Sequence, residues 1–150
     1  ACTCSHSQDE AYSRKISGPL ADRLDLHCRL AALEPGSWSE PGAHSTGLDS
    51  ATLRQQVAGA RALQAQRWGR GILNSEISSA RLLEDGSFSR PGLEVLRRVS
   101  TRLALSGRGF VRTLRVARTV GDLAGHQEAG ETEILEALSY RASSPGVFES

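Results

Sequence analysis

The arginines of residues 107–124 are the side chains best suited to chemistry in this sequence. At about 100° per residue, Arg108, Arg112 and Arg115 fall within about 60° of one another around a helix, and Arg118 widens this stripe. The apolar residues fall on the opposite face. Such a stripe is either the solvated face of a packed helix or a surface that binds phosphate through planar guanidinium groups. Arg108 would lie in the first helical turn, where free backbone N–H groups also favour an anion.

Cysteines and histidines offer weaker candidates. Cys2 and Cys4 could supply two of the four thiolates of a tetrahedral zinc site, but two thiolates cannot close such a site, and unpaired thiols are the simpler interpretation. Cys28 is expected to be a small buried apolar residue. A catalytic histidine dyad or triad is not supported, because no carboxylate or cysteine partner stands at a useful spacing from His6, His44 or His126.

Four stretches after residue 48 repeat apolar residues at spacings of three and four, which is typical of helices that pack through one face. They span residues 50–68, 92–104, 107–124 and 131–141. In the first of them, the predicted buried face carries Leu53, Val57, Ala60 and Leu63. Residues 72–90 show a mixed pattern.

Helix ends can also be located. Gly69 and Gly71 are expected to end the first helix, Asp85-Gly86 to form a turn, and Ser89 to cap a helix with Pro91 in its first turn.

The first third of the chain reads differently. Residues 7–24 predict a helix interrupted at Ser17-Gly18-Pro19, and residues 24–30 alternate apolar and polar side chains as a half-buried strand does. Residues 34–48 hold two Pro-Gly pairs and predict a linker. The expected fold is therefore mainly α. Its parts would be a helix-strand remnant of an α/β core (1–33), the linker (34–48), a helical bundle (49–142) and a tail (143–150).

The composition restricts the class of protein that this chain can be. With 39% hydrophobic and 23% charged residues and a net charge of +1, the chain reads as globular and lacks a strongly basic nucleic-acid arm. No apolar run approaches the roughly 18 residues that span a bilayer, so no membrane association is expected. The odd count of 3 cysteines does not suit a secreted disulfide scaffold, which favours a cytoplasmic location. The start without Met suggests part of a longer protein.

Three segments resemble one family. Residues 16–27, ISGPLADRLDLH, resemble the ISGPLLDRxDLH segment of the Mg-chelatase-like AAA+ ATPases. Residues 105–125, LSGRGFVRTLRVARTVGDLAG, are similar to that family's LSxRxxxRxLRVARTIADLAG helix, and residues 136–141, EALSYR, to its EALxYR ending. The three matches follow the family's order and spacing over most of residues 1–141. The competence-associated members are the most similar, because they also carry a Cys-x-Cys that pairs with an upstream CPC.

This resemblance implies an α/β ATPase core followed by a helical lid, assembled as a ring of identical subunits, commonly a hexamer. It implies that Arg23 is the arginine finger, which reaches the ATP of the neighbouring subunit. It also implies that Arg108 is the sensor 2 residue, with Arg112 and Arg115 beside it on the ATP-binding side. Cys2 and Cys4 would be half of a zinc site.

One departure from the family limits the expected activity. The sequence contains no Gly-x-x-x-x-Gly-Lys-Ser/Thr and no strand ending in Asp-Glu, so ATP and Mg²⁺ would be bound mainly by residues of an upstream core. Hydrolysis by this chain alone is not expected. Three functions remain open: part of a ring motor acting on DNA, part of the motor subunit of a true magnesium chelatase, or a helical interaction module without a nucleotide role.

Overall fold

The computed structural model describes residues 23–28 and 49–142, together with Ser5, Ser7, Gln8, Ala11 and Leu30. The regular elements of the second range are helices, joined by short loops, which confirms the mainly α fold. They are α3 (Ser50–Trp68), the 3-10 helix η2 (Asn74–Glu76), α4 (Ser79–Asp85), α5 (Arg90–Arg102), α6 (Gly107–Leu123) and α7 (Glu131–Ala142). None of the helices in the described ranges is long and apolar enough to cross a membrane.

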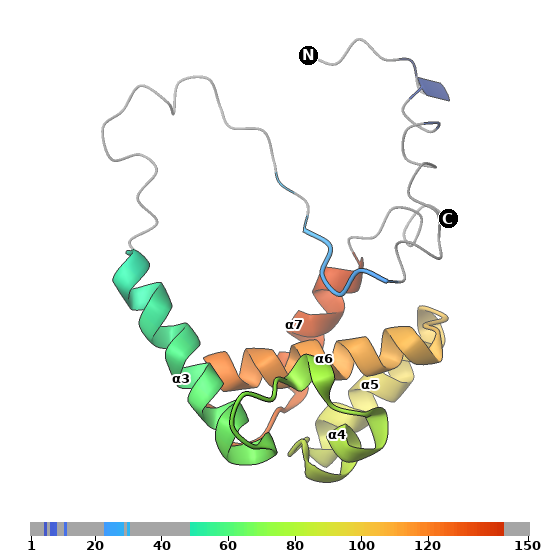
Figure 1. Cartoon of the computed structure of the whole chain (residues 1–150). Coiled ribbons are helices and arrows are strands. Elements are labelled where there is room, and N and C mark those ends of the chain that lie inside the picture. Colours follow the sequence, from blue (N-terminus) through green and yellow to red (C-terminus); the bar gives the residue numbers. More distant parts are fainter. Residues whose placement is uncertain are drawn as a thin grey trace, which may run out of the picture.

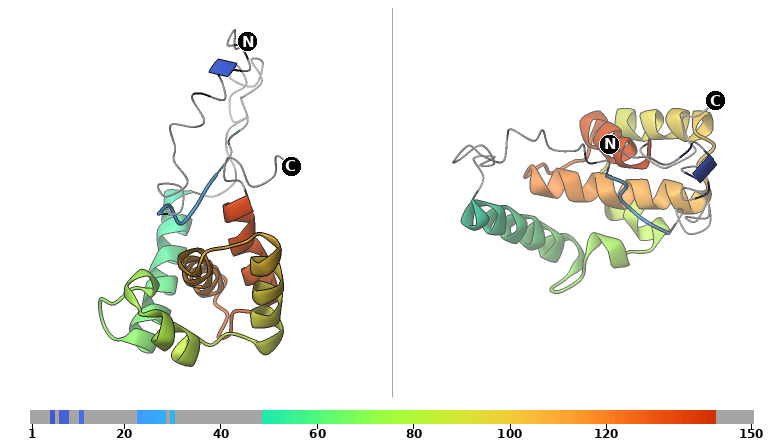
Figure 2. Two further views of the ribbon diagram at one scale, coloured as in Figure 1. Left: turned by 90° about the vertical axis from the view of Figure 1, so that its right-hand side faces the viewer. Right: turned by 90° about the horizontal axis from the view of Figure 1, so that it is seen from above.

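Helix α6 lies at the centre of this bundle (Figures 1 and 2). It packs against α3, η2, α4 and α7, while α5 packs against α7. Leu114 and Ala117 of α6 are fully buried in the common core. The other core residues are Trp68, Ile77, Leu82, Val95, Leu96, Ile134, Ala137 and Leu138. Because so many elements meet α6, its position is fixed on most sides.

The helix ends follow local chemistry. Ser89 and Ser106 each accept a backbone N–H of the following turn through the side-chain oxygen, from Gly92 at 3.1 Å and from Gly109 at 3.0 Å. Gly69 ends α3 with a φ of 108°, a conformation that glycine adopts without strain. The predicted helices over 50–68, 92–104, 107–124 and 131–141 are confirmed with small shifts of their ends. Helices η2 and α4 fall within the stretch that the sequence left as mixed.

The predicted buried face of α3 is wrong in its first half. Leu53 and Val57 are 46% and 50% exposed. The residues that α3 buries are Ala60, Gln64 and Trp68. The reason is that the first turns of α3 extend beyond α6 (Figures 1 and 2), so an apolar stripe there has no neighbouring helix to cover it.

The predicted strand over 24–30 is also wrong for its described residues, 24–28 and Leu30, none of which is in a strand. A strand needs a neighbour to complete its hydrogen-bond ladder. Here the backbone N–H of His27 instead donates to the carbonyl of Tyr140 in α7, at 2.9 Å. Cys28 is exposed rather than buried. Most of the predicted helix over 7–24, and all of the predicted linker, lie outside the described residues.

Candidate functional site

An open pocket lies beside the first two turns of α6. It has a volume of about 390 Å³ and is lined by Ser79, Gly107, Arg108, Val111, Arg112 and Arg115. Three guanidinium groups and one hydroxyl thus surround it, and no carboxylate is among the described residues that line it. Such a donor set suits the oxygens of a phosphate. The pocket stands at the N-terminal end of α6, where the helix dipole adds to the attraction for an anion.

The three arginines around the pocket are not equivalent. Arg112 donates to Asp25, with Nη1 2.8 Å from Oδ1, and to the backbone carbonyl of Arg23. Arg115 donates from Nη2 to the carbonyl of Ile77 at 2.7 Å. Arg108 is exposed and makes no ion pair with any described residue. Arg108 is therefore the guanidinium best able to accept a new anionic partner.

The other predicted site residues are placed less fully. Arg23 is exposed, in the segment that Arg112 contacts. Cys2 and Cys4 lie outside the described residues, so the zinc proposal stays a prediction. Within the described part of the chain, no group of three or more His, Cys, Asp or Glu side chains could hold a metal ion.

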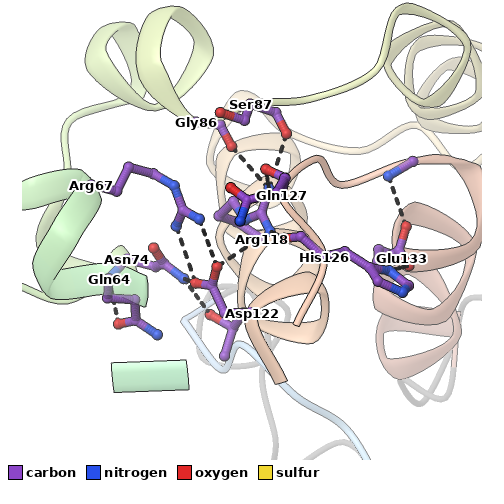
Figure 3. A network of polar contacts seen from close by, with 12 residues as sticks. Gln64, Arg67, Asn74, Gly86, Ser87, Arg118, Asp122, His126, Gln127 and Glu133 are labelled. Carbon is purple, nitrogen blue, oxygen red and sulfur yellow. Dashed lines mark hydrogen bonds and ion pairs between the residues drawn. The ribbon is translucent and has the colours of Figure 1, made fainter. Parts of the chain in front are cut away.

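Arg118 does not belong to the exposed stripe that the sequence predicted. It is fully buried, with 0% exposure. Figure 3 shows its guanidinium between two loops, those that precede α5 and α7. It donates from Nη1 to the carbonyls of Ser87 at 3.0 Å and Gln127 at 3.2 Å, and from Nη2 to that of His126 at 2.6 Å. A further bond reaches the carbonyl of Gly86 at 3.3 Å. Arg118 thus fixes the two loops to α6.

Asp122, one turn further along α6, balances the charge of Arg118 at 3.2 Å. The same carboxylate accepts two bonds from Arg67 of α3, at 2.8 and 3.2 Å, and one from Asn74 at 2.8 Å (Figure 3). Burial lowers the pKa of Arg118, and the charge of Asp122 opposes that effect. A buried charge is tolerated when it is paired and hydrogen-bonded, as it is here. The network therefore joins α3, η2 and α6 to the two loops.

A second pair contradicts the expectation that His126 has no carboxylate partner. Its Nδ1 lies 2.9 Å from Oε1 of Glu133. Burial of Glu133 would raise its pKa, but hydrogen bonds from the backbone of Gly130 and from His126 outweigh this and leave the pKa lowered. The residues are seven apart and meet because the loop before α7 turns the chain back, which spacing alone does not indicate. The His126 side chain is exposed whereas Glu133 is buried, and neither residue lines the arginine pocket.

A substitution at Gly121, which lies against Arg118, would test how firmly the Arg118 side chain is held. A Cβ at Gly121 would lie 2.7 Å from Nη2 of Arg118, which is too close. Alanine normally stabilises a helix interior by about 1 kcal/mol relative to glycine. Because the guanidinium is bonded on several sides and cannot move away, we expect Gly121→Ala to lower the melting temperature instead.

Gly59 of α3 is the matched control, since a Cβ there meets nothing within 4 Å. Gly59→Ala should hold or raise the melting temperature in the same thermal scan. If both variants were equally stabilising, Arg118 would have room to shift and would not be firmly held.

Comparison with known families agrees with this architecture. Residues 47–141 match the family described as magnesium chelatase, subunit ChlI C-terminal, and residues 1–37 match the family described as magnesium chelatase, subunit ChlI. The chain therefore belongs to the magnesium chelatase ChlI family. The first match covers nearly all of the described bundle.

Individual relatives are similar over most of this chain. An uncharacterized protein of Mycobacterium tuberculosis is 39% identical over 93% of the chain, which covers 27% of that protein. The competence protein ComM of Haemophilus influenzae is 34% identical over 87% of the chain and 25% of its own length. The uncharacterized protein YifB of Escherichia coli is 32% identical over 93% of the chain and 27% of its own length. The chain spans about a quarter of the length of these curated relatives.

Proposed function

We propose that this chain provides two arginines to an ATP-hydrolysing ring assembled from copies of a longer protein. Arg108 acts as sensor 2 and contacts the phosphates of ATP bound to its own subunit. Arg23 acts as the arginine finger and contacts the ATP of the neighbouring subunit. The observation that carries this proposal is the open basic pocket at the start of α6, in which Arg108 is exposed and unpaired with any described residue.

The chemistry required of these residues is electrostatic. The transferred γ-phosphoryl group carries negative charge on its oxygens in the transition state, and a guanidinium placed against them stabilises that charge. ATP bound with Mg²⁺ supplies the phosphoryl group. The chain's own part is to orient the two arginines, with α6 held in position by the buried network around Arg118 and Asp122. Arg115, which donates to Ile77 at 2.7 Å, supports the wall of the pocket.

We further propose that the ring acts on DNA, which is supported by similarity to the competence protein ComM and by the Cys-x-Cys of Cys2 and Cys4. The alternative is the motor subunit of a magnesium chelatase, which the family's description favours. Stimulation of ATP hydrolysis by DNA would discriminate between the two. Full-length protein whose hydrolysis is unaffected by single- or double-stranded DNA would argue for the alternative.

Arg108→Ala tests the sensor 2 assignment. In the full-length protein, this change is expected to weaken binding of a fluorescent, non-hydrolysable ATP analogue by about tenfold to a hundredfold, because one charge-assisted contact to phosphate contributes roughly 1.5–3 kcal/mol. Stability should change by less than about 0.5 kcal/mol, since Arg108 is exposed.

Arg97→Ala is the matched control. Arg97 is also an exposed helical arginine, in α5, and does not line the pocket. From the sequence alone, Arg118 would be a natural control for Arg108. It is unsuitable as a control because it is fully buried, so its removal is expected to destabilise the bundle. Equal analogue affinity in Arg108→Ala and Arg97→Ala, both folded, would refute the assignment.

A further inference from the structure

The segment that carries Arg23 is attached to the two helices at the C-terminal end of the bundle. Asp25 accepts from Arg112 of α6 at 2.8 Å, and the carbonyl of Arg23 accepts from the same guanidinium. The carbonyl of Leu24 accepts from Arg141 of α7 at 3.3 Å. With the bond from His27 N–H to the carbonyl of Tyr140, four contacts between described residues hold the stretch from Arg23 to His27, three of them through backbone groups of the stretch.

Arg112 is the member of this set that also reaches the arginine pocket. It lines the pocket with Arg108, one helical turn away, while its guanidinium is turned to Asp25 and Arg23. Its side chain is only 19% exposed. A guanidinium already paired with a carboxylate and a carbonyl has less charge and fewer donors left for phosphate. The geometry therefore separates the roles of Arg108 and Arg112, which the sequence groups together.

We propose that Arg112 is a positioning residue that couples the pocket around Arg108 to the segment that carries Arg23. When phosphate engages Arg108, the side chains that line the pocket rearrange, and Arg112, which lines the same pocket, transmits that rearrangement to Asp25 and the backbone of Arg23. The state of a subunit's own nucleotide thereby sets the position of the arginine offered to the next subunit. This inference rests on the proposed function for the roles of Arg108 and Arg23. The link between the two residues rests on the contacts of Arg112.

The coupling predicts an effect on exchange that does not depend on hydrolysis. In full-length protein, hydrogen–deuterium exchange of the His27 amide, which donates to Tyr140, should change at least about threefold when a non-hydrolysable ATP analogue binds. In Arg112→Gln, exchange at His27 should be faster without nucleotide and should no longer respond to the analogue. Analogue affinity should stay within about twofold of the wild type, whereas hydrolysis should fall about tenfold or more.

Asp25→Asn is the matched partner variant, and the double variant should be no worse than Arg112→Gln alone, because Arg112→Gln already removes the ion pair with Asp25 together with the bond to the Arg23 carbonyl. Exchanging the two charges, with Arg112→Asp and Asp25→Arg together, should restore part of the response. A wild-type His27 amide that ignores the analogue overturns the coupling. So does an Arg112→Gln variant that binds the analogue as weakly as Arg108→Ala, because Arg112 would then be a nucleotide ligand. Failure of the proposed function is distinct, since it would appear as normal analogue binding in Arg108→Ala.

Discussion

Arg118→Met is expected to lower the free energy of unfolding by about 3–5 kcal/mol, a large part of the stability of a domain this size. The change removes a fully buried cation that donates to four backbone carbonyls and to Asp122. It leaves those carbonyls with fewer donors, and it leaves Asp122 with Arg67 as its remaining cationic partner. Chemical denaturation followed by circular dichroism would measure the loss.

Arg118→Lys distinguishes the shape of the guanidinium from its charge. An ammonium keeps the charge but has one nitrogen in place of the planar fork that reaches both loops, so we expect it to recover only a minor part of the stability. Arg97→Ala, at an exposed helical position, should change the free energy of unfolding by less than about 0.5 kcal/mol. A loss below about 1 kcal/mol in Arg118→Met would mean that the loops do not depend on this side chain.

Arg23→Ala in the full-length protein is expected to reduce ATP hydrolysis by about 10³-fold or more, with analogue binding nearly unchanged. The physical reason is that a finger residue contacts the phosphate of a neighbouring subunit mainly in the transition state. Its side chain is exposed here, and its segment is held through Asp25 and backbone carbonyls, so truncation should leave that segment in place. Steady-state hydrolysis and analogue titration would be measured on the same preparation.

Mixed rings give the control for a role in trans. Combining Arg23→Ala subunits with subunits disabled in their own phosphate-binding loop should restore some hydrolysis, because an intact site then forms where a subunit with Arg23 faces one with a working nucleotide site. Absence of recovery, in rings shown to be mixed by size and mass, would count against a contact between subunits. Arg29→Ala is the comparison variant, since Arg29 is a nearby arginine in the sequence that is not assigned as the finger. Its rate of ATP hydrolysis should stay much closer to that of the wild type than the rate of Arg23→Ala.

Much of the bundle was predictable because its signals are local. Ser89 and Ser106 mark helix starts and Gly69 a helix end through bonds made within one turn. The shared face of Arg108, Arg112 and Arg115 likewise follows from helical geometry alone, and the three residues do surround one pocket.

The predictions that were wrong depend on contacts with residues that are remote in sequence. The angle of Arg118 around α6 puts it at the edge of the stripe, and its burial depends on loops at residues 86–87 and 126–127 that are remote in sequence. Its spacing of four from Asp122 was the one available signal. The alternation over 24–30 could not be tested from the local sequence either, because a strand requires a neighbouring strand. Leu24, Asp25 and His27 bond to α6 and α7 instead.

The loops that Arg118 holds have a consequence for how sequences of this family can diverge. Every loop group that Arg118 binds is a backbone carbonyl, while the side chains of Ser87, His126 and Gln127 are exposed. Any amino acid that permits the same backbone path supplies an equivalent acceptor. Mutational drift at His126 and Gln127 should therefore be nearly neutral for this contact, whereas Arg118 has no interchangeable substitute. Selection on a single side chain in α6 can therefore maintain this contact to both loops without requiring particular side chains at Ser87, His126 and Gln127.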